Sequence, residues 1–216
     1  MNVVAVGLIA AFAVFAVADW RAAWRDDRRQ RQLTKPAATV TLVAIAALVG
    51  QMAGDARTAL IVAVVLCLAG DVALLGDTDA HFLGGLGAFA VGHIAYVVTA
   101  LLVGVDARRM TIAIGFIVVL LVFQTATKML PGARRHGGNA MLGAVAGYSL
   151  IISAMVITAT GTPSLVAMTG AKLFAVSDTM IGYNRFVKPI RRADVPIMVT
   201  YHAGQLLLIL GLIAGG

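Results

Sequence analysis

Long apolar stretches run through most of this 216-residue chain. Hydrophobic residues make up 60% of the sequence, charged residues only 12%, and the mean hydropathy is +0.93. A helix of about 20 apolar residues crosses a bilayer core, and these stretches lack the polar/apolar alternation of barrel strands. We therefore predict an all-α, polytopic membrane helix bundle that forms one domain over residues 1–216. The predicted spans are 2–19, 37–53, 58–75, 83–103, 111–127, 140–159, 164–183 and 196–214.

Basic residues are distributed unevenly between the predicted loops. Thirteen of the 17 follow the first, fifth and seventh spans, whereas Arg57, Arg108 and Arg109 lie in loops on the opposite side. Short loops rich in Lys and Arg stay cytoplasmic, so both termini are predicted to face outward, with the cell (inner) membrane as the expected location. The net charge of +7 then reflects topology and contact with bilayer headgroups. No nucleic-acid partner is predicted, because the basic segments lack interleaved aromatic residues.

Two aspartates interrupt apolar runs, Asp71 within residues 66–75 and Asp178 within residues 170–182. A carboxylate inside a membrane helix is costly and by default marks function, so both are candidate catalytic residues. The predicted orientation places them in the same, cytoplasmic half of the membrane, where we expect them to share a cavity. Further polar side chains in or beside the spans are candidates for the pocket: Lys35, His93, Tyr96, Lys172, Ser177, Arg185, Tyr201 and Gln205.

Several of these candidates have structural alternatives. His93 can form a hydrogen bond between helices as readily as it can act in catalysis. The Ser177 hydroxyl can have the structural role of donating a hydrogen bond to a backbone carbonyl oxygen. Tyr96 and Tyr201 are also compatible with an aromatic belt at the membrane interface. Lys172 is either a snorkelling side chain or a counter-ion of Asp178, and we favour the counter-ion.

Sequence motifs narrow the chemistry. The metal motif HExxH and the nucleophile motif GxSxG are both missing, and the single cysteine, Cys67, allows no intrachain disulfide. His81 and His136 are expected in loops, so zinc is unsupported and no metal or cofactor is predicted. Two carboxylates in unlike surroundings can serve as one acid and one base. A metal-dependent membrane lipid hydrolase and a proton-coupled small-molecule transporter remain as alternatives.

An ordered set of short motifs resembles the YhhN/TMEM86 family of lysoplasmalogenases over nearly the whole chain. The motifs are Lys35-Pro36, Gly70-Asp71, GLGAFAVGHIAY over Gly85–Tyr96, GAKLFAVSD over Gly170–Asp178, Arg185-Phe186, and Tyr201 with Gln205. The resemblance implies an eight-helix membrane hydrolase that cleaves the vinyl ether bond of lysoplasmalogens to a fatty aldehyde and a glycerophospho-alcohol. It further implies Asp71 and Asp178 as catalytic carboxylates, with the other matching polar residues in the pocket.

The chemistry of such a substrate fits two carboxylates. A vinyl ether opens when its β-carbon is protonated, and the resulting oxocarbenium ion is captured by water, so the reaction needs a positioned acid and a group that activates water. A lysophospholipid partner can enter from the bilayer while its headgroup stays at the cytoplasmic interface. Lys35, Arg185 or Lys188 are then expected to hold its phosphate.

Overall fold

The computed structural model describes residues 3–216, apart from the side chains of residues 116 and 119–124. The described residues form eight α-helices and one π-helical segment, with no strand among them. The elements are α1 (Val3–Arg25), α2 (Arg28–Leu48), α3 (Gly54–Ala73), α4 (Asp79–Val103), α5 (Ala107–Leu120), the π-helix η1 (Leu121–Met129), α6 (Leu130–Gly161), α7 (Leu165–Phe186) and α8 (Asp194–Gly215). The predicted all-α bundle is confirmed.

Six of these helical segments are long and apolar enough to cross a membrane. They are Val3–Arg25, Gly54–Ala73, Asp79–Val103, Thr125–Gly161, Leu165–Phe186 and Asp194–Gly215. Helix α2 falls short because its first two turns are rich in Arg, Gln and Lys, and α5 falls short because it has only 14 residues before η1. Helices α2 and α5 nevertheless pack against the other helices, so the described residues form a bundle of eight α-helices.

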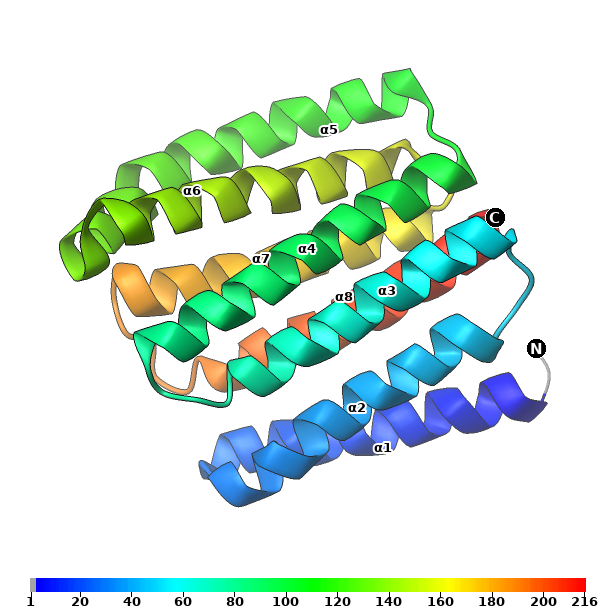
Figure 1. The fold of residues 1–216 in the computed structure, drawn as a ribbon, viewed down its shortest axis with the longest axis horizontal. Coiled ribbons are helices and arrows are strands. Elements are labelled where there is room, and N and C mark those ends of the chain that lie inside the picture. The colour runs from blue at the N-terminus through cyan, green and yellow to red at the C-terminus, as the bar shows by residue number, and fades with distance from the viewer. Residues whose placement is uncertain (1–2) are drawn as a thin grey trace.

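The helices run alternately up and down, and most consecutive helices lie side by side, except that α6 lies between α4 and α5 (Figure 1). Val3 and the C-terminus lie at one end of the bundle, together with the α2–α3, α4–α5 and α6–α7 connections. The α1–α2, α3–α4 and α7–α8 connections lie at the opposite end, which we call the loop end (Figure 1). Helix α8 lies against α7, α1 and α2, and thereby joins the N-terminal pair to the rest of the bundle.

Three predicted helix starts are wrong. The span expected at 37–53 is a helix that begins at Arg28, because the Asp27 side chain accepts a hydrogen bond from the Gln30 amide (3.0 Å) and caps it. Lys35 therefore lies inside a helix. His81 and His136, expected in loops, lie in the first turn of α4 and in the short part of α6 that precedes a kink at Gly137 and Gly138.

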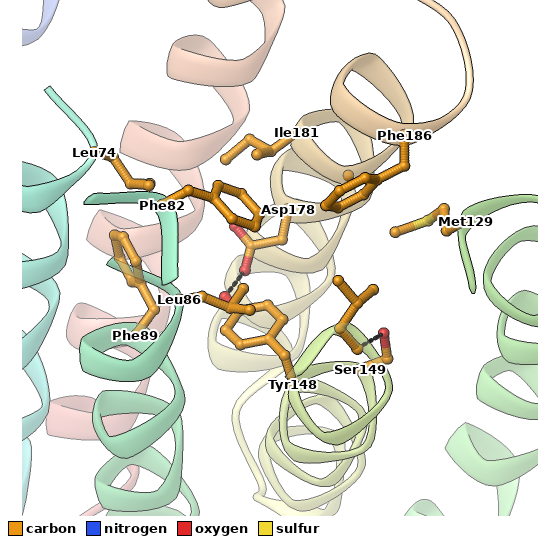
Figure 2. A pocket seen from close by; sticks show the side chains of 12 residues that line it. Leu74, Phe82, Leu86, Phe89, Met129, Tyr148, Ser149, Asp178, Ile181 and Phe186 are labelled. Atoms are coloured by element: carbon orange, nitrogen blue, oxygen red, sulfur yellow. Dashed lines mark hydrogen bonds between the residues drawn. The ribbon is translucent and has the colours of Figure 1, made fainter. Parts of the chain in front are cut away.

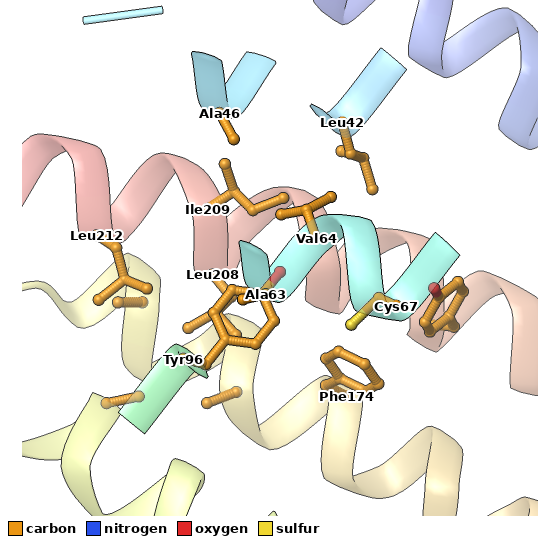
Figure 3. Close-up of a cluster of buried hydrophobic side chains, with 14 of the residues drawn as sticks. Leu42, Ala46, Ala63, Val64, Cys67, Tyr96, Phe174, Leu208, Ile209 and Leu212 are labelled. Atoms are coloured by element: carbon orange, nitrogen blue, oxygen red, sulfur yellow. The ribbon is translucent and has the colours of Figure 1, made fainter. Parts of the chain in front are cut away.

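The core contains many small and branched side chains from α2, α3 and α8, with the aromatic rings of Tyr96 of α4 and Phe174 of α7 among them (Figure 3). Helices α7 and α8 approach most closely at glycines. A Cβ added at Gly170 would lie 2.7 Å from the Gly204 carbonyl oxygen, and one added at Gly204 would lie 2.7 Å from the Phe174 amide nitrogen. This close approach matters for function because it sets the spacing between the α7 and α8 side chains described below.

Replacing Gly170 by Ala is expected to destabilise the bundle. The added methyl group meets backbone atoms that cannot move independently, and overpacking of this kind costs about 1–3 kcal/mol. The measurement is the thermal unfolding midpoint of the detergent-solubilised protein. Gly143→Ala on α6 is the matched control, because a Cβ there meets nothing within 4 Å and Ala favours a helix more than Gly does. Equal midpoints for the two variants would contradict the prediction.

Candidate active site

Asp71 lies in the last turn of α3 and is almost completely buried. Its Oδ2 accepts hydrogen bonds from the Thr39 hydroxyl (2.5 Å) and the Tyr201 hydroxyl (2.6 Å), and its Oδ1 lies 3.3 Å from the Lys35 ammonium nitrogen. Lys35 and Thr39 are four residues apart on α2 and so face α3 together. Three donors around one carboxylate are the surroundings that suit an ionised group.

The hydrogen-bonded network around Asp71 continues through α8 to α4. The Gln205 amide donates to the Tyr201 hydroxyl oxygen (3.2 Å), and the Tyr96 hydroxyl donates to Gln205 Oε1 (2.5 Å). Tyr96 is 1% exposed and Tyr201 2% exposed, so neither belongs to an interfacial aromatic belt. Five of the residues singled out in the sequence therefore form one buried network: Lys35, Asp71, Tyr96, Tyr201 and Gln205.

Asp178 has different surroundings, in the second half of α7. It accepts a hydrogen bond from the Tyr148 hydroxyl of α6, and its Oδ2 lies 3.6 Å from His93 Nε2 of α4. His93 Nδ1 lies 2.6 Å from the Phe89 carbonyl oxygen. Because a carbonyl oxygen only accepts, Nδ1 carries the hydrogen, and in the neutral ring Nε2 is left as a proton acceptor facing Asp178.

An aromatic layer lies between the surroundings of the two carboxylates. The Phe174 ring is 5.2 Å from the Tyr201 ring and 4.7 Å from the His93 ring, between centroids, and Phe89 contacts the same two rings at 6.0 and 6.4 Å. Phe174 and Asp178 are four residues apart on α7, so this layer lies one helical turn from the carboxyl group.

Asp178 lines two cavities. The first, the inner cavity, has an empty volume of about 450 Å³, open solvent included, and a mostly apolar wall that includes Phe82, Leu86 and Phe89 of α4 and Phe186 of α7 (Figure 2). The second, the far cavity, has an empty volume of about 460 Å³, open solvent included, and lies between α5, η1, α6 and α7. Both are also lined by Met129, Tyr148 and Ser149. Asp71 lines neither of them, so these two cavities do not provide the shared space expected from the sequence.

A larger polar cleft opens at the loop end of the bundle. Its empty volume is about 1,420 Å³, open solvent included, and it shares Leu74, Phe82 and Ile181 with the inner cavity. The cleft and the inner cavity therefore adjoin each other across these three side chains. Four basic side chains line it, Arg28, Arg31, Lys35 and Arg185, together with the carboxylates of Asp26, Asp77 and Asp194.

The basic residues of the cleft are held by ion pairs. Arg31 lies 2.5 Å from Asp194 and 3.9 Å from Asp19, a fully buried aspartate of α1 that also accepts a hydrogen bond from Thr34. Arg185 pairs with Asp79. Lys188, a predicted phosphate ligand, is exposed and does not line the cleft.

The remaining candidates have other positions. The Ser177 hydroxyl donates a hydrogen bond to the Ile197 carbonyl oxygen of α8 (3.0 Å) and so bridges α7 and α8. This is the structural role that the sequence analysis considered for Ser177. Lys172 is partly exposed and lines neither cavity nor the cleft. Its role as counter-ion of Asp178 stays a prediction.

Four residues of the site were not among the predicted site residues. Tyr148 and Thr39 bind the two carboxylates, and Phe174 and Asp19 complete the aromatic layer and the cleft. Tyr148 is a polar residue in an apolar run, which is a usable signal. Thr39 is not distinctive, because membrane threonines usually bond within their own helix. Over the residues described, no group of three or more His, Cys, Asp or Glu side chains is placed to hold a metal ion.

Comparison with known proteins supports the resemblance found in the motifs. The chain is 31% identical over 183 residues to the lysoplasmalogenase of Mycobacterium bovis, covering 82% of this chain and 69% of that protein. It is also 31% identical over 153 residues to lysoplasmalogenase TMEM86B of Homo sapiens, covering 68% and 60%, and 31% identical over 164 residues to lysoplasmalogenase TMEM86A of Bos taurus, covering 71% and 64%. No solved structure matches the chain.

The family model covers both carboxylate clusters. It matches residues 30–212, from the first turn of α2 to the last turn of α8, and this region includes every residue of the two carboxylate clusters. Together with the six apolar helices, the match identifies an integral, multi-pass membrane protein. The chain belongs to the YhhN family.

Proposed function

We propose that this protein is a lysoplasmalogenase, which hydrolyses the vinyl ether bond of a lysoplasmalogen to a fatty aldehyde and a glycerophospho-alcohol. The names of its relatives support this proposal. The observation that carries it is the position of Asp178, which faces an unprotonated His93 nitrogen and lines two cavities, one of them next to a cleft that has four basic side chains in its wall.

Asp178 is the proposed acid. Opening a vinyl ether requires transfer of a proton to its β-carbon, so the acid must contact the hydrocarbon side of the bond. Asp178 meets this need because it lines an apolar cavity, and enzymes keep a carboxylic acid protonated near neutral pH in such surroundings. After the transfer, the Tyr148 hydroxyl stabilises the carboxylate through its hydrogen bond.

His93 is the proposed base for the second half of the reaction. Water attacks the oxocarbenium carbon, His93 Nε2 takes one proton from that water, and a hemiacetal forms. The hemiacetal then breaks its carbon–oxygen bond to the glycerol oxygen. The hemiacetal hydroxyl loses its proton as the carbon becomes the aldehyde, and the glycerol oxygen gains a proton and leaves as the alcohol. Proton transfer from the imidazolium to Asp178 across the 3.6 Å gap restores both groups.

Asp71 is proposed to hold Lys35 in position and to take no part in the proton transfers. It pairs with Lys35, which lines the cleft, and it lines neither cavity at Asp178. We propose that the headgroup phosphate binds beside Lys35 and Arg31. The Lys35 ammonium and the Arg31 guanidinium groups can both donate charge-assisted hydrogen bonds to a phosphate. The positive-inside rule then places the loop end, and with it the cleft, on the cytoplasmic side.

Removing the proposed acid is expected to abolish turnover. Asp178→Asn keeps the size of the side chain but cannot supply the proton, and loss of general acid catalysis lowers kcat by about 10²–10⁴. The measurement is release of long-chain aldehyde from a lysoplasmalogen by purified protein, with and without a chelator. Asp55→Asn, an exposed aspartate at the other end of the bundle, is the control. Aldehyde release that Asp178→Asn leaves near the wild-type rate would refute the assignment, and chelator-sensitive release would favour the metal-dependent alternative.

His93→Asn is expected to keep the fold and lose activity. The asparagine amide can still donate to the Phe89 carbonyl oxygen in place of Nδ1, while the acceptor at Nε2 is removed. We expect kcat to fall by about 10²-fold or more with an unchanged unfolding midpoint. Activity within a few fold of wild type would show that His93 is only a bridge between helices.

Lys35→Gln is expected to weaken binding of phosphate-bearing substrates selectively. The KM for a lysoplasmalogen should rise about tenfold while kcat changes less, because an anchoring contact acts equally in the ground and transition states. A 1-alkenylglycerol, which has no phosphate, should show no such change and serves as the internal control for folding. Arg108→Gln, at the opposite end of the bundle, is the control variant. Parallel losses on both substrates would reject the anchoring role.

A further inference from the structure

The far cavity extends from Asp178 away from the cleft. On α6 its wall continues from Tyr148 to Val156, which at 1.5 Å per residue is about 12 Å farther from the loop end. On the antiparallel α7 its wall includes Ala175, which also lies on the side of Asp178 away from the loop end. The order along the bundle is therefore cleft, inner cavity, Asp178 and far cavity.

Small side chains create the far cavity. Ser149 and Ser153 of α6 and Ala175 of α7 line it, where larger residues would fill the space between the helices. Larger apolar side chains, Ile152 and Val156 of α6 and Ile117 of α5, also line it.

Three hydroxyl groups of this wall donate hydrogen bonds inside their own helices. Ser149 donates to the Val145 carbonyl oxygen (2.8 Å), Ser153 to that of Ser149 (2.6 Å), and Thr179 to that of Ala175 (2.7 Å). Hydroxyl groups bonded in this way have no hydrogen left to donate to a ligand in the cavity. Despite its serines and threonines, the wall therefore suits a hydrocarbon better than a polar ligand.

We propose that the far cavity is the subsite for the alkenyl chain beyond the reacting bond, and that Ser153 and Ala175 determine the chain length it accepts. This inference rests on the proposed function. A substrate with its phosphate in the cleft and its vinyl ether at Asp178 must continue on the far side of Asp178. The far cavity is the space found there, and its direction leads the chain toward the depth of the bilayer core.

The test compares octenyl and hexadecenyl lysoplasmalogens on wild type, Ser153→Leu and Ala175→Leu. Filling the cavity should lower kcat/KM for the hexadecenyl substrate about tenfold and that for the octenyl substrate less than about twofold, by the scale on which apolar pockets discriminate. Ala154→Leu is the matched control, since Ala154 follows Ser153 on α6 and is exposed on the outer face of the bundle. Identical chain-length profiles for all four proteins would overturn the proposal.

A binding measurement separates failure of this inference from failure of the proposed function. Saturated 1-O-octyl and 1-O-hexadecyl lysophosphoethanolamine have no vinyl ether and are not cleaved. The wild type should bind the hexadecyl compound more tightly, and Ser153→Leu should remove this preference. If wild type releases no aldehyde from any lysoplasmalogen but shows this binding pattern, the chain subsite stands and the proposed reaction fails. Equal binding of both lipids by the wild type would overturn the subsite whatever the activity.

Discussion

A carboxylate that is buried in an apolar bundle must be partnered, because an isolated charge in such surroundings costs several kcal/mol. Asp71 meets this requirement through donors from two helices that are distant in sequence, Lys35 and Thr39 on α2 and Tyr201 on α8. The pairing ties α2 to α3 and α8 at the level of the cleft. It also explains why a helix as polar as the first half of α2 packs inside this bundle, since its lysine faces a carboxylate instead of hydrocarbon.

The surroundings of Asp178 depend on the position of α8, although Asp178 does not belong to the hydrogen-bonded network of Asp71. Phe174 and Phe89 contact the rings of both Tyr201 and His93, so a shift of α8 would be transmitted to the histidine that faces Asp178. The glycine contacts between α7 and α8 permit the close approach on which this aromatic layer depends. The two aspartates thus have unlike surroundings on one continuous scaffold, one amid donors and one on a cavity wall, as a division into binding and acid chemistry requires.

Much of the fold follows from the sequence, because hydropathy and the length of a membrane-crossing helix are local properties. Six of the eight predicted spans correspond to helices that meet the criteria for crossing a membrane. The predicted start of α2 was wrong because a charged segment is usually a loop in a membrane protein. The sequence does not show that Lys35 in this segment faces the Asp71 carboxylate. The polar cluster was also partly predictable, since Asp71, His93, Asp178 and Tyr201 are conspicuous in apolar runs.

The sequence by itself determined the membrane class, the helical architecture and the identity of the costly polar residues, because each follows from residue type and spacing along one helix. Only the tertiary structure decided which of those residues meet. It placed Tyr148 on Asp178, separated the two aspartates by an aromatic layer, and left cavities where small residues from α6 and α7 face each other. These contacts join helices that are far apart in sequence, so they depend on how the helices pack, which no single segment encodes.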